Sequence, residues 1–267
     1  MTETVMVDVA GLGIRCRVDA QGSNAPWVVF SNSLGTALEV WDAQAAALSP
    51  RFRILRYDQR GHGGSGVPAE PCDFRRLGAD LLALLDRFDI RRCCLVGLSM
   101  GVPTALQAFE SRPDRFERLV LCDGQAATAA GGADIWSQRI EQARNEGMAA
   151  LADATMARWF SPEFVRSGSA DRVRAMMAAT PLEGLVACIR ALQGYDYAHV
   201  LATIDVPCLL MVGARDGALP AVMARLRERI AGAELVEIAE AGHIPNVEQP
   251  EAFNRALLRF LDAPDSN

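Results

Sequence analysis

The chain has 267 residues, of which half are hydrophobic and 22% are charged, and this composition predicts one globular domain, with or without a large insertion. Its net charge of −6 argues against nucleic acid or an anionic membrane as a general partner, and the absence of lysine excludes Schiff-base catalysis. No apolar run approaches the roughly 20 residues that span a bilayer, and the N-terminus lacks a signal-peptide pattern, so we expect a cytoplasmic protein.

The first predicted elements are two alternating segments, residues 5–9 and 14–18, which a glycine turn joins into a β-hairpin. Short apolar strands follow at residues 27–30, 53–57, 93–97, 119–122, 208–212 and 235–238. Amphipathic helices are predicted between most of them, at residues 74–88 with Asp73 as the N-cap and after prolines 220 and 250. This alternation indicates an α/β fold with a mostly parallel, doubly wound sheet and the hairpin at its antiparallel edge.

The alternation stops between residues 126 and 204, where the sequence predicts helices only, at residues 135–147, 148–160 and 170–177. A strand-poor insertion in an α/β chain predicts a helical cap over the carboxyl ends of the strands, where such folds bind ligands. We therefore expect residues 1–125 and 205–267 to form the core and residues 126–204 to form the cap.

The cysteines give no sign of a metal site or of disulfides. Their spacing fits neither a zinc site nor a disulfide framework, and their number is odd. We therefore expect reduced thiols and no bound metal for all seven: Cys16, Cys72, Cys93, Cys94, Cys122, Cys188 and Cys208.

A Gly-x-Ser-x-Gly pentapeptide, residues 97–101, carries the first chemical signal. It follows the apolar strand 93–96 and opens an apolar helix, which is the strand–turn–helix context that a nucleophile elbow requires. Glycine is needed on both sides of the serine because a Cβ there would collide with the neighbouring backbone. Ser99 is therefore the predicted nucleophile.

A serine hydroxyl needs a base, and the chain has three histidines. We predict His243 as the base because it lies between the last strand and the last helix, at the expected catalytic edge. His62 lies in a glycine-rich loop that we interpret as structural, and His199 is expected on the surface. Asp216, which follows a strand, is favoured as the acid that orients His243, with Asp123 as its rival. The chain order Ser, Asp, His is the order of an α/β-hydrolase.

Two backbone N–H groups should stabilise the developing oxyanion. Met100 supplies one because it follows the nucleophile directly. Leu34, in the loop after strand 27–30, is our candidate for the other.

These motifs, together with the loop 58–65 and the segment 241–243, resemble the α/β-hydrolase superfamily over essentially the whole chain. Many members have His-Gly where this chain has Asn32-Ser33, and the segment 32–36 is instead similar to the 3-oxoadipate enol-lactonases of aromatic degradation. The cap segments 136–140, 147–152, 158–160 and 180–184 are similar to that subfamily's insertion. The resemblance implies hydrolysis of 3-oxoadipate enol-lactone to 3-oxoadipate, a step of the β-ketoadipate pathway, without a cofactor.

The implied substrate carries a carboxylate, which the net negative charge of the protein would repel. Local positive charge must therefore hold it, and Arg139 and Arg190 are the cap arginines that we expect to do so. Trp136 is the candidate for an apolar wall of the pocket. The sequence leaves open which arginine meets the carboxylate, and it does not give the oligomeric state.

Three other functions fit the same motifs. A carbon–carbon bond hydrolase of ring-cleavage products and a general carboxylesterase would use the same triad. A non-catalytic receptor would close the cap over a small molecule, although the complete triad argues against it.

Overall fold

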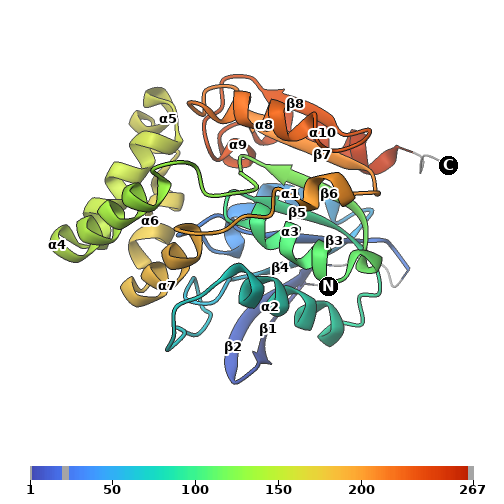
Figure 1. Ribbon diagram of the computed structural model, residues 1–267, viewed down its shortest axis with the longest axis horizontal. Helices are drawn as coiled ribbons and strands as arrows, with labels where there is room; N and C mark the ends of the chain where they lie inside the picture. Colours follow the sequence, from blue (N-terminus) through green and yellow to red (C-terminus); the bar gives the residue numbers. More distant parts are fainter. Residues whose placement is uncertain (1, 20–23, 264–267) are drawn as a thin grey trace.

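The computed structural model describes residues 2–19 and 24–263 (Figure 1). In this part of the chain, eight strands form one sheet in the order β1-β2-β4-β3-β5-β6-β7-β8. β1 pairs with β2, and β2 with β4, in antiparallel orientation at one edge, and the remaining pairs, from β4–β3 to β7–β8, are parallel. The strands are β1 (Thr2–Val9), β2 (Leu12–Asp19), β3 (Trp27–Ser31), β4 (Arg53–Tyr57), β5 (Cys93–Leu98), β6 (Phe116–Cys122), β7 (Cys208–Gly213) and β8 (Glu234–Ile238). The predicted α/β-hydrolase fold, with its antiparallel edge, is confirmed.

Helices cover both faces of the sheet and create two apolar cores. Leu95 of β5 packs into one core, with α2 (Phe74–Arg87), α3 (Gly101–Ser111) and α8 (Leu219–Arg227). Val96 packs into the other, with α1 (Asp42–Leu48) and α10 (Pro250–Asp262). Successive side chains of a strand point to opposite faces, so a continuously apolar strand fills both cores. Short helices η1 (Leu38–Trp41), η2 (Pro113–Arg115) and α9 (Pro245–Glu248) lie between the main elements.

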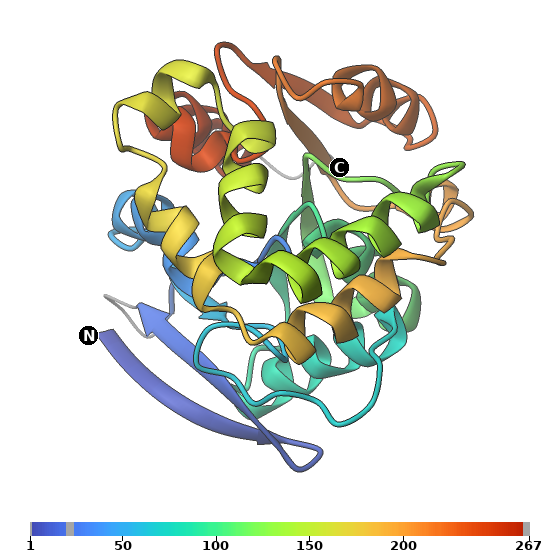
Figure 2. The same ribbon diagram turned by 90° about the vertical axis from the view of Figure 1, so that its left-hand side faces the viewer.

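The predicted insertion, all of which the structure describes, contains helices and one isolated bridge, between Ala127 and Asp196. The helices α4 to α7 lie together beyond one end of the strands, as the two views show (Figures 1 and 2). The elements are α4 (Gly132–Trp159), α5 (Pro162–Arg166), α6 (Asp171–Ala179), α7 (Leu182–Leu192) and η3 (Val200–Thr203). Backbone angles at Gly147 (φ 87°, ψ 165°) break α4 into two segments, at the boundary that the sequence predicts.

The cap packs tightly on the core at two glycine contacts. Gly184 in α7 meets Gly61 in the loop after β4 backbone to backbone, so a Cβ on either residue would collide with the other main chain. Met177 in α6 lies against Gly35, where a Cβ would strike its sulfur atom. These contacts hold the cap helices directly above the loops that follow β3 and β4.

No single helix in residues 2–19 and 24–263 has the length and apolar character needed to cross a membrane, although α6 and α7, bent by 96° to one another, meet these criteria as a pair. All seven cysteines are buried and have free thiols.

Candidate active site

Ser99 lies on a sharp turn between β5 and α3. Its φ of 55° is in the left-handed region, which is strained for a residue with a Cβ. A Cβ on Gly97 would collide with the carbonyl oxygen of Gly101, and a Cβ on Gly101 would collide with that of Ser31. The two glycines therefore allow the turn that holds the Ser99 hydroxyl above the edge of the sheet.

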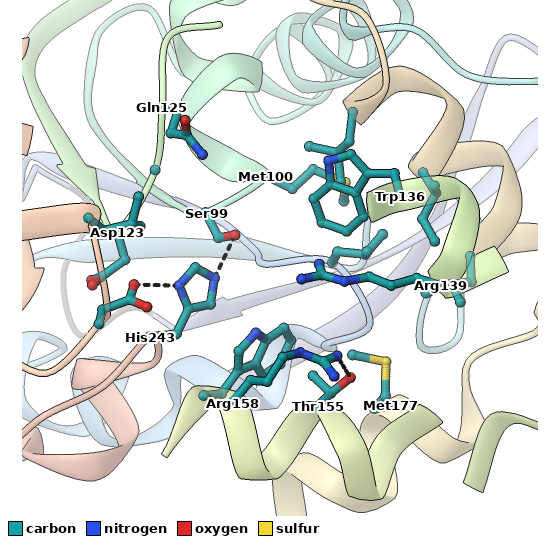
Figure 3. Close-up of a pocket in the computed structure, with 18 of the residues that line it drawn as sticks. Ser99, Met100, Asp123, Gln125, Trp136, Arg139, Thr155, Arg158, Met177 and His243 are labelled. Atoms are coloured by element: carbon teal, nitrogen blue, oxygen red, sulfur yellow. Dashed lines mark hydrogen bonds and ion pairs between the residues drawn. The ribbon is translucent and has the colours of Figure 1, made fainter. Parts of the chain in front are cut away.

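The structure brings Ser99, Asp216 and His243 together in one hydrogen-bonded chain (Figure 3). His243 Nε2 lies 2.9 Å from Ser99 Oγ, and His243 Nδ1 lies 2.6 Å from Asp216 Oδ2. An ionised carboxylate can only accept, so Nδ1 carries the proton and Nε2 is free to accept the serine proton. This is the arrangement that activates a serine for attack on an acyl carbon.

Asp123, the rival acid in the sequence, makes no hydrogen bond to His243. It directly follows β6, is fully buried and accepts the N–H of Gly213 at 2.8 Å. Carboxylate oxygens of Asp123 and Asp216 and a ring nitrogen of His243 lie within 4.8 Å of one another, a spacing that a metal ion could use. Both ring nitrogens of His243 are already engaged by Asp216 and Ser99, however, which favours a triad over a metal centre.

Leu34 and Met100, the predicted oxyanion-hole residues, line the same cavity as Ser99. Leu34 lies in the loop after β3, and Met100 is the residue before α3. Asn32, the residue at which the chain departs from many α/β hydrolases, is buried and fixes this loop. Its amide donates to the carbonyl of Tyr57 at 2.8 Å and accepts the indole N–H of Trp41 at 2.9 Å.

The cavity above Ser99 has a volume of about 290 Å³, and both core and cap residues form its walls. Trp136 and Arg139, two of the predicted substrate contacts, come from the first segment of α4. The guanidinium of Arg139 stacks on the Trp136 ring, with 4.3 Å from Cζ to the ring centroid. Thr155, Arg158 and Trp159 come from the segment after Gly147, so the break lets one helix line the cavity from two directions (Figure 3).

The two cavity arginines give the cap wall a positive charge. Burial, together with the neighbouring charge of Arg158, lowers the pKa of Arg139 to about 10, so Arg139 stays charged at neutral pH. Burial also lowers the pKa of Arg158, whose Nη2 donates to Thr155 Oγ1 at 2.8 Å. In residues 2–19 and 24–263 neither guanidinium forms an ion pair with a carboxylate. Two close cations without a counter-ion favour an anionic ligand between them.

Arg190, the other arginine predicted to meet the substrate, lies elsewhere, so this prediction is corrected. It is exposed on the outside of α7, where its guanidinium donates to Gln193 Oε1 at 2.8 Å. The reason is helical phase, because the face of α7 that packs inward carries Leu185, Ile189 and Leu192. Arg158, and not Arg190, lines the cavity together with Arg139. The sequence offered no signal that distinguishes Arg158 from other cap arginines.

The two remaining histidines lie outside the cavity. His62 is buried in the loop after β4, where its Nδ1 bonds the carbonyl of Arg60 at 3.1 Å and burial lowers its pKa to about 4. His199 is exposed and pairs with Glu110 at 2.7 Å. Their positions agree with the structural and surface roles predicted for them.

The loop that carries His243 is tied to the cap. The backbone N–H of His243 donates to the carbonyl of Trp159 at 2.7 Å. The buried carboxylate of Glu248 accepts two further N–H groups, that of Gly242 at 2.7 Å and that of Ser161 at 2.8 Å. Glu248 therefore joins the end of α4 to the residue that precedes the proposed base.

We expect Glu248→Gln to destabilise the protein by about 1–3 kcal/mol, because an amide nitrogen cannot accept and leaves one buried N–H without a partner. Urea unfolding measures this change. Glu251→Gln is the control, since Glu251 is exposed at the start of α10 and should change the free energy of unfolding by less than about 0.5 kcal/mol. Equal stability of the two variants would contradict the bridging role of Glu248.

Comparison with known proteins places this site in a family. The model of the α/β hydrolase family matches residues 23–256. The chain is 34% identical to 3-oxoadipate enol-lactonase 2 of Acinetobacter baylyi over 88% of both chains. It is 31% identical to RutD of Pseudomonas savastanoi, whose name describes a carbamate hydrolase, over 91% of this chain and 96% of that one.

Solved structures agree. The enol-lactonase from Burkholderia xenovorans superposes with a TM-score of 0.92 and 38% identity, covering 97% of this chain and all of that one. The similarity therefore extends over the sheet and the cap alike. The chain belongs to the α/β hydrolase family.

Proposed function

We propose that this protein hydrolyses 3-oxoadipate enol-lactone to 3-oxoadipate in the β-ketoadipate pathway, through an acyl-enzyme on Ser99. The observation that supports this most is that the Ser99–His243–Asp216 chain and the Arg139–Arg158 pair share one small cavity. A cavity of about 290 Å³ suits a small ligand, and its positive wall suits a carboxylate. The enol-lactonases among the relatives support the same substrate.

The first half of the reaction opens the ring. His243 Nε2 takes the proton of Ser99 as Oγ attacks the lactone carbonyl, and Asp216 stabilises the imidazolium that forms. The backbone N–H groups of Leu34 and Met100 stabilise the oxyanion. The ring C–O bond then breaks, and the enol oxygen leaves with a proton from His243. Because an enol is more acidic than an alcohol, it is the better leaving group.

The second half releases the product. The opened chain remains attached to Ser99 as an ester, and its enol becomes a ketone by moving a proton from oxygen to carbon. His243 next removes a proton from a water molecule, which attacks the ester carbonyl, and Ser99 regains its proton as it leaves. One water is consumed, and the product carries one more carboxylate than the lactone.

Steady-state assays with three substrate classes test the proposal. We expect kcat/KM to be highest for the enol-lactone, lower for a nitrophenyl ester and lowest for a vinylogous diketo acid. A higher value for the nitrophenyl ester would favour a general carboxylesterase, and a higher value for the diketo acid would favour a carbon–carbon bond hydrolase. Failure of a fluorophosphonate to label Ser99 would favour a receptor.

The arginines should determine recognition of the carboxylate. We expect Arg139→Met to lower kcat/KM for the enol-lactone by about 10- to 100-fold, mainly through KM, because a charged hydrogen bond is lost. Hydrolysis of neutral nitrophenyl acetate should be unaffected. Arg190→Met is the matched control, since Arg190 lies outside the cavity and should leave both activities unchanged. An unchanged KM in Arg139→Met would rule this arginine out as the carboxylate ligand.

A further inference from the structure

A second acid, Asp123, lies close to Asp216, and the proposed ring-opening mechanism assigns no role to it. The backbone N–H of Asp123 donates to the carbonyl of Met211 at 3.0 Å, and its Oδ1 accepts the N–H of Gly213 at 2.8 Å. Both partners belong to β7, the strand that leads to Asp216. Asp123 is thus held by the segment that positions the triad acid.

The other oxygen of Asp123 has no conventional partner. Oδ2 is buried and accepts no hydrogen bond from the described residues. A carboxylate oxygen of Asp123 instead lies within 4.8 Å of one of Asp216, whose Oδ2 is bonded to His243. The titratable groups around Asp123 in the described chain are Cys122, Asp216 and His243, and no arginine pairs with it.

Two ionised carboxylates cannot share a buried site of this kind without strong repulsion, whereas a single proton between them removes it. Burial raises the pKa of Asp123 well above its usual range, and the negative charge of Asp216 raises it further. Asp123 is the more buried of the two and makes no hydrogen bond to His243, whereas Asp216 does, which favours the proton on Asp123.

We propose that Asp123 is a neutral carboxylic acid whose O–H group donates to Asp216, making it a positioning residue for the triad. In this arrangement Asp123 Oδ1 accepts from Gly213 and Oδ2–H donates to the Asp216 carboxylate. The pair carries one negative charge, all of it available to the imidazolium of His243. Asp216 is then held by a donor on one side and by His243 on the other.

Asparagine reproduces this pattern, because its Oδ1 can accept and its Nδ2 can donate, but it cannot ionise. We expect Asp123→Asn to keep kcat within about threefold of the wild type, since one uncharged donor to the Asp216 carboxylate replaces another. Asp123→Leu, which branches at Cγ as aspartate does but has no donor, should lower kcat by about 10- to 100-fold with KM unchanged, because Asp216 and His243 lose their alignment. A loss in Asp123→Asn as large as in Asp216→Asn, or full activity in Asp123→Leu, would overturn the proposal.

The kcat measurements on these variants rest on the proposed function of Ser99, His243 and Asp216, but a second measurement needs no substrate. The infrared difference spectrum of wild type minus Asp123→Asn at neutral pH should contain the C=O stretch of a protonated carboxylic acid. Other protonated carboxyl groups cancel in the difference. A spectrum with ionised carboxylate bands alone would overturn the proposal even if the enzyme hydrolyses the lactone.

Discussion

Ser99→Ala should abolish turnover of the enol-lactone, with kcat lowered by about 10⁴- to 10⁶-fold. The variant retains His243 and Asp216 but has no oxygen to form the acyl-enzyme. Only binding and the oxyanion-stabilising N–H groups remain to accelerate attack by water. A stopped assay with high enzyme concentration measures the residual rate.

The fold should survive this change. Alanine keeps the Cβ of serine, so the strain at φ 55° is the same in both proteins, and only the hydrogen bond to His243 is lost. Thermal unfolding and circular dichroism of Ser99→Ala should therefore match the wild type closely. Appreciable lactonase activity in a folded Ser99→Ala protein would contradict the assignment of the nucleophile.

Asp216→Asn should lower kcat by about 10⁴-fold with little change in KM. The amide removes the negative charge that stabilises the imidazolium. Its Nδ2 can also donate to His243 Nδ1, which forces the proton onto Nε2 and leaves no acceptor for the Ser99 proton. Steady-state kinetics with the enol-lactone measures the loss.

Asp123→Asn, measured in parallel, is the matched control for Asp216→Asn. The same substitution is then made in two neighbouring acids, of which only Asp216 bonds His243. We expect the large loss at Asp216 alone. The reverse pattern would make Asp123 the triad acid.

The sequence predicts the sheet, and the meeting of Ser99, His243 and Asp216, well because both depend on local patterns. The strand at 93–97 is continuously apolar and flanked by turn residues, so it can be placed without its neighbours. Ser99, Asp216 and His243 each follow a strand, and the carboxyl ends of parallel strands meet at one edge of a sheet. Their approach within hydrogen-bond distance follows from this topology.

The cap was harder to predict because its function depends on helix orientation. Arg139 lies in the predicted helix 135–147, and Arg190 lies in the apolar segment that forms α7. Only the docking of α4 and α7 decides that Arg139 lines the cavity and that Arg190 is exposed to solvent. Arg158 enters the cavity because α4 breaks at Gly147 and turns its second segment back over the triad. No periodicity within one helix contains this information.

Local sequence patterns also do not predict tertiary contacts between distant segments. The backbone contact of Gly61 with Gly184 joins the core to the cap across more than a hundred residues. Glu248 lies in a four-residue helix, α9, that is too short for a periodic signal. The sequence indicates Asp123 only as a competitor of Asp216, since a protonated partner can be inferred only from burial and the distance between the two acids.

In the proposed function, a cap with two arginines presents an anionic lactone to Ser99, His243 and Asp216. The most direct test is to measure kcat/KM of the wild type for the enol-lactone and for its methyl ester, which has the same ring but no charge. We predict a value about 100-fold or more higher for the carboxylate, because only the carboxylate offsets the positive charges of Arg139 and Arg158 in the cavity wall. Equal values for the two lactones would contradict recognition of the carboxylate by these arginines.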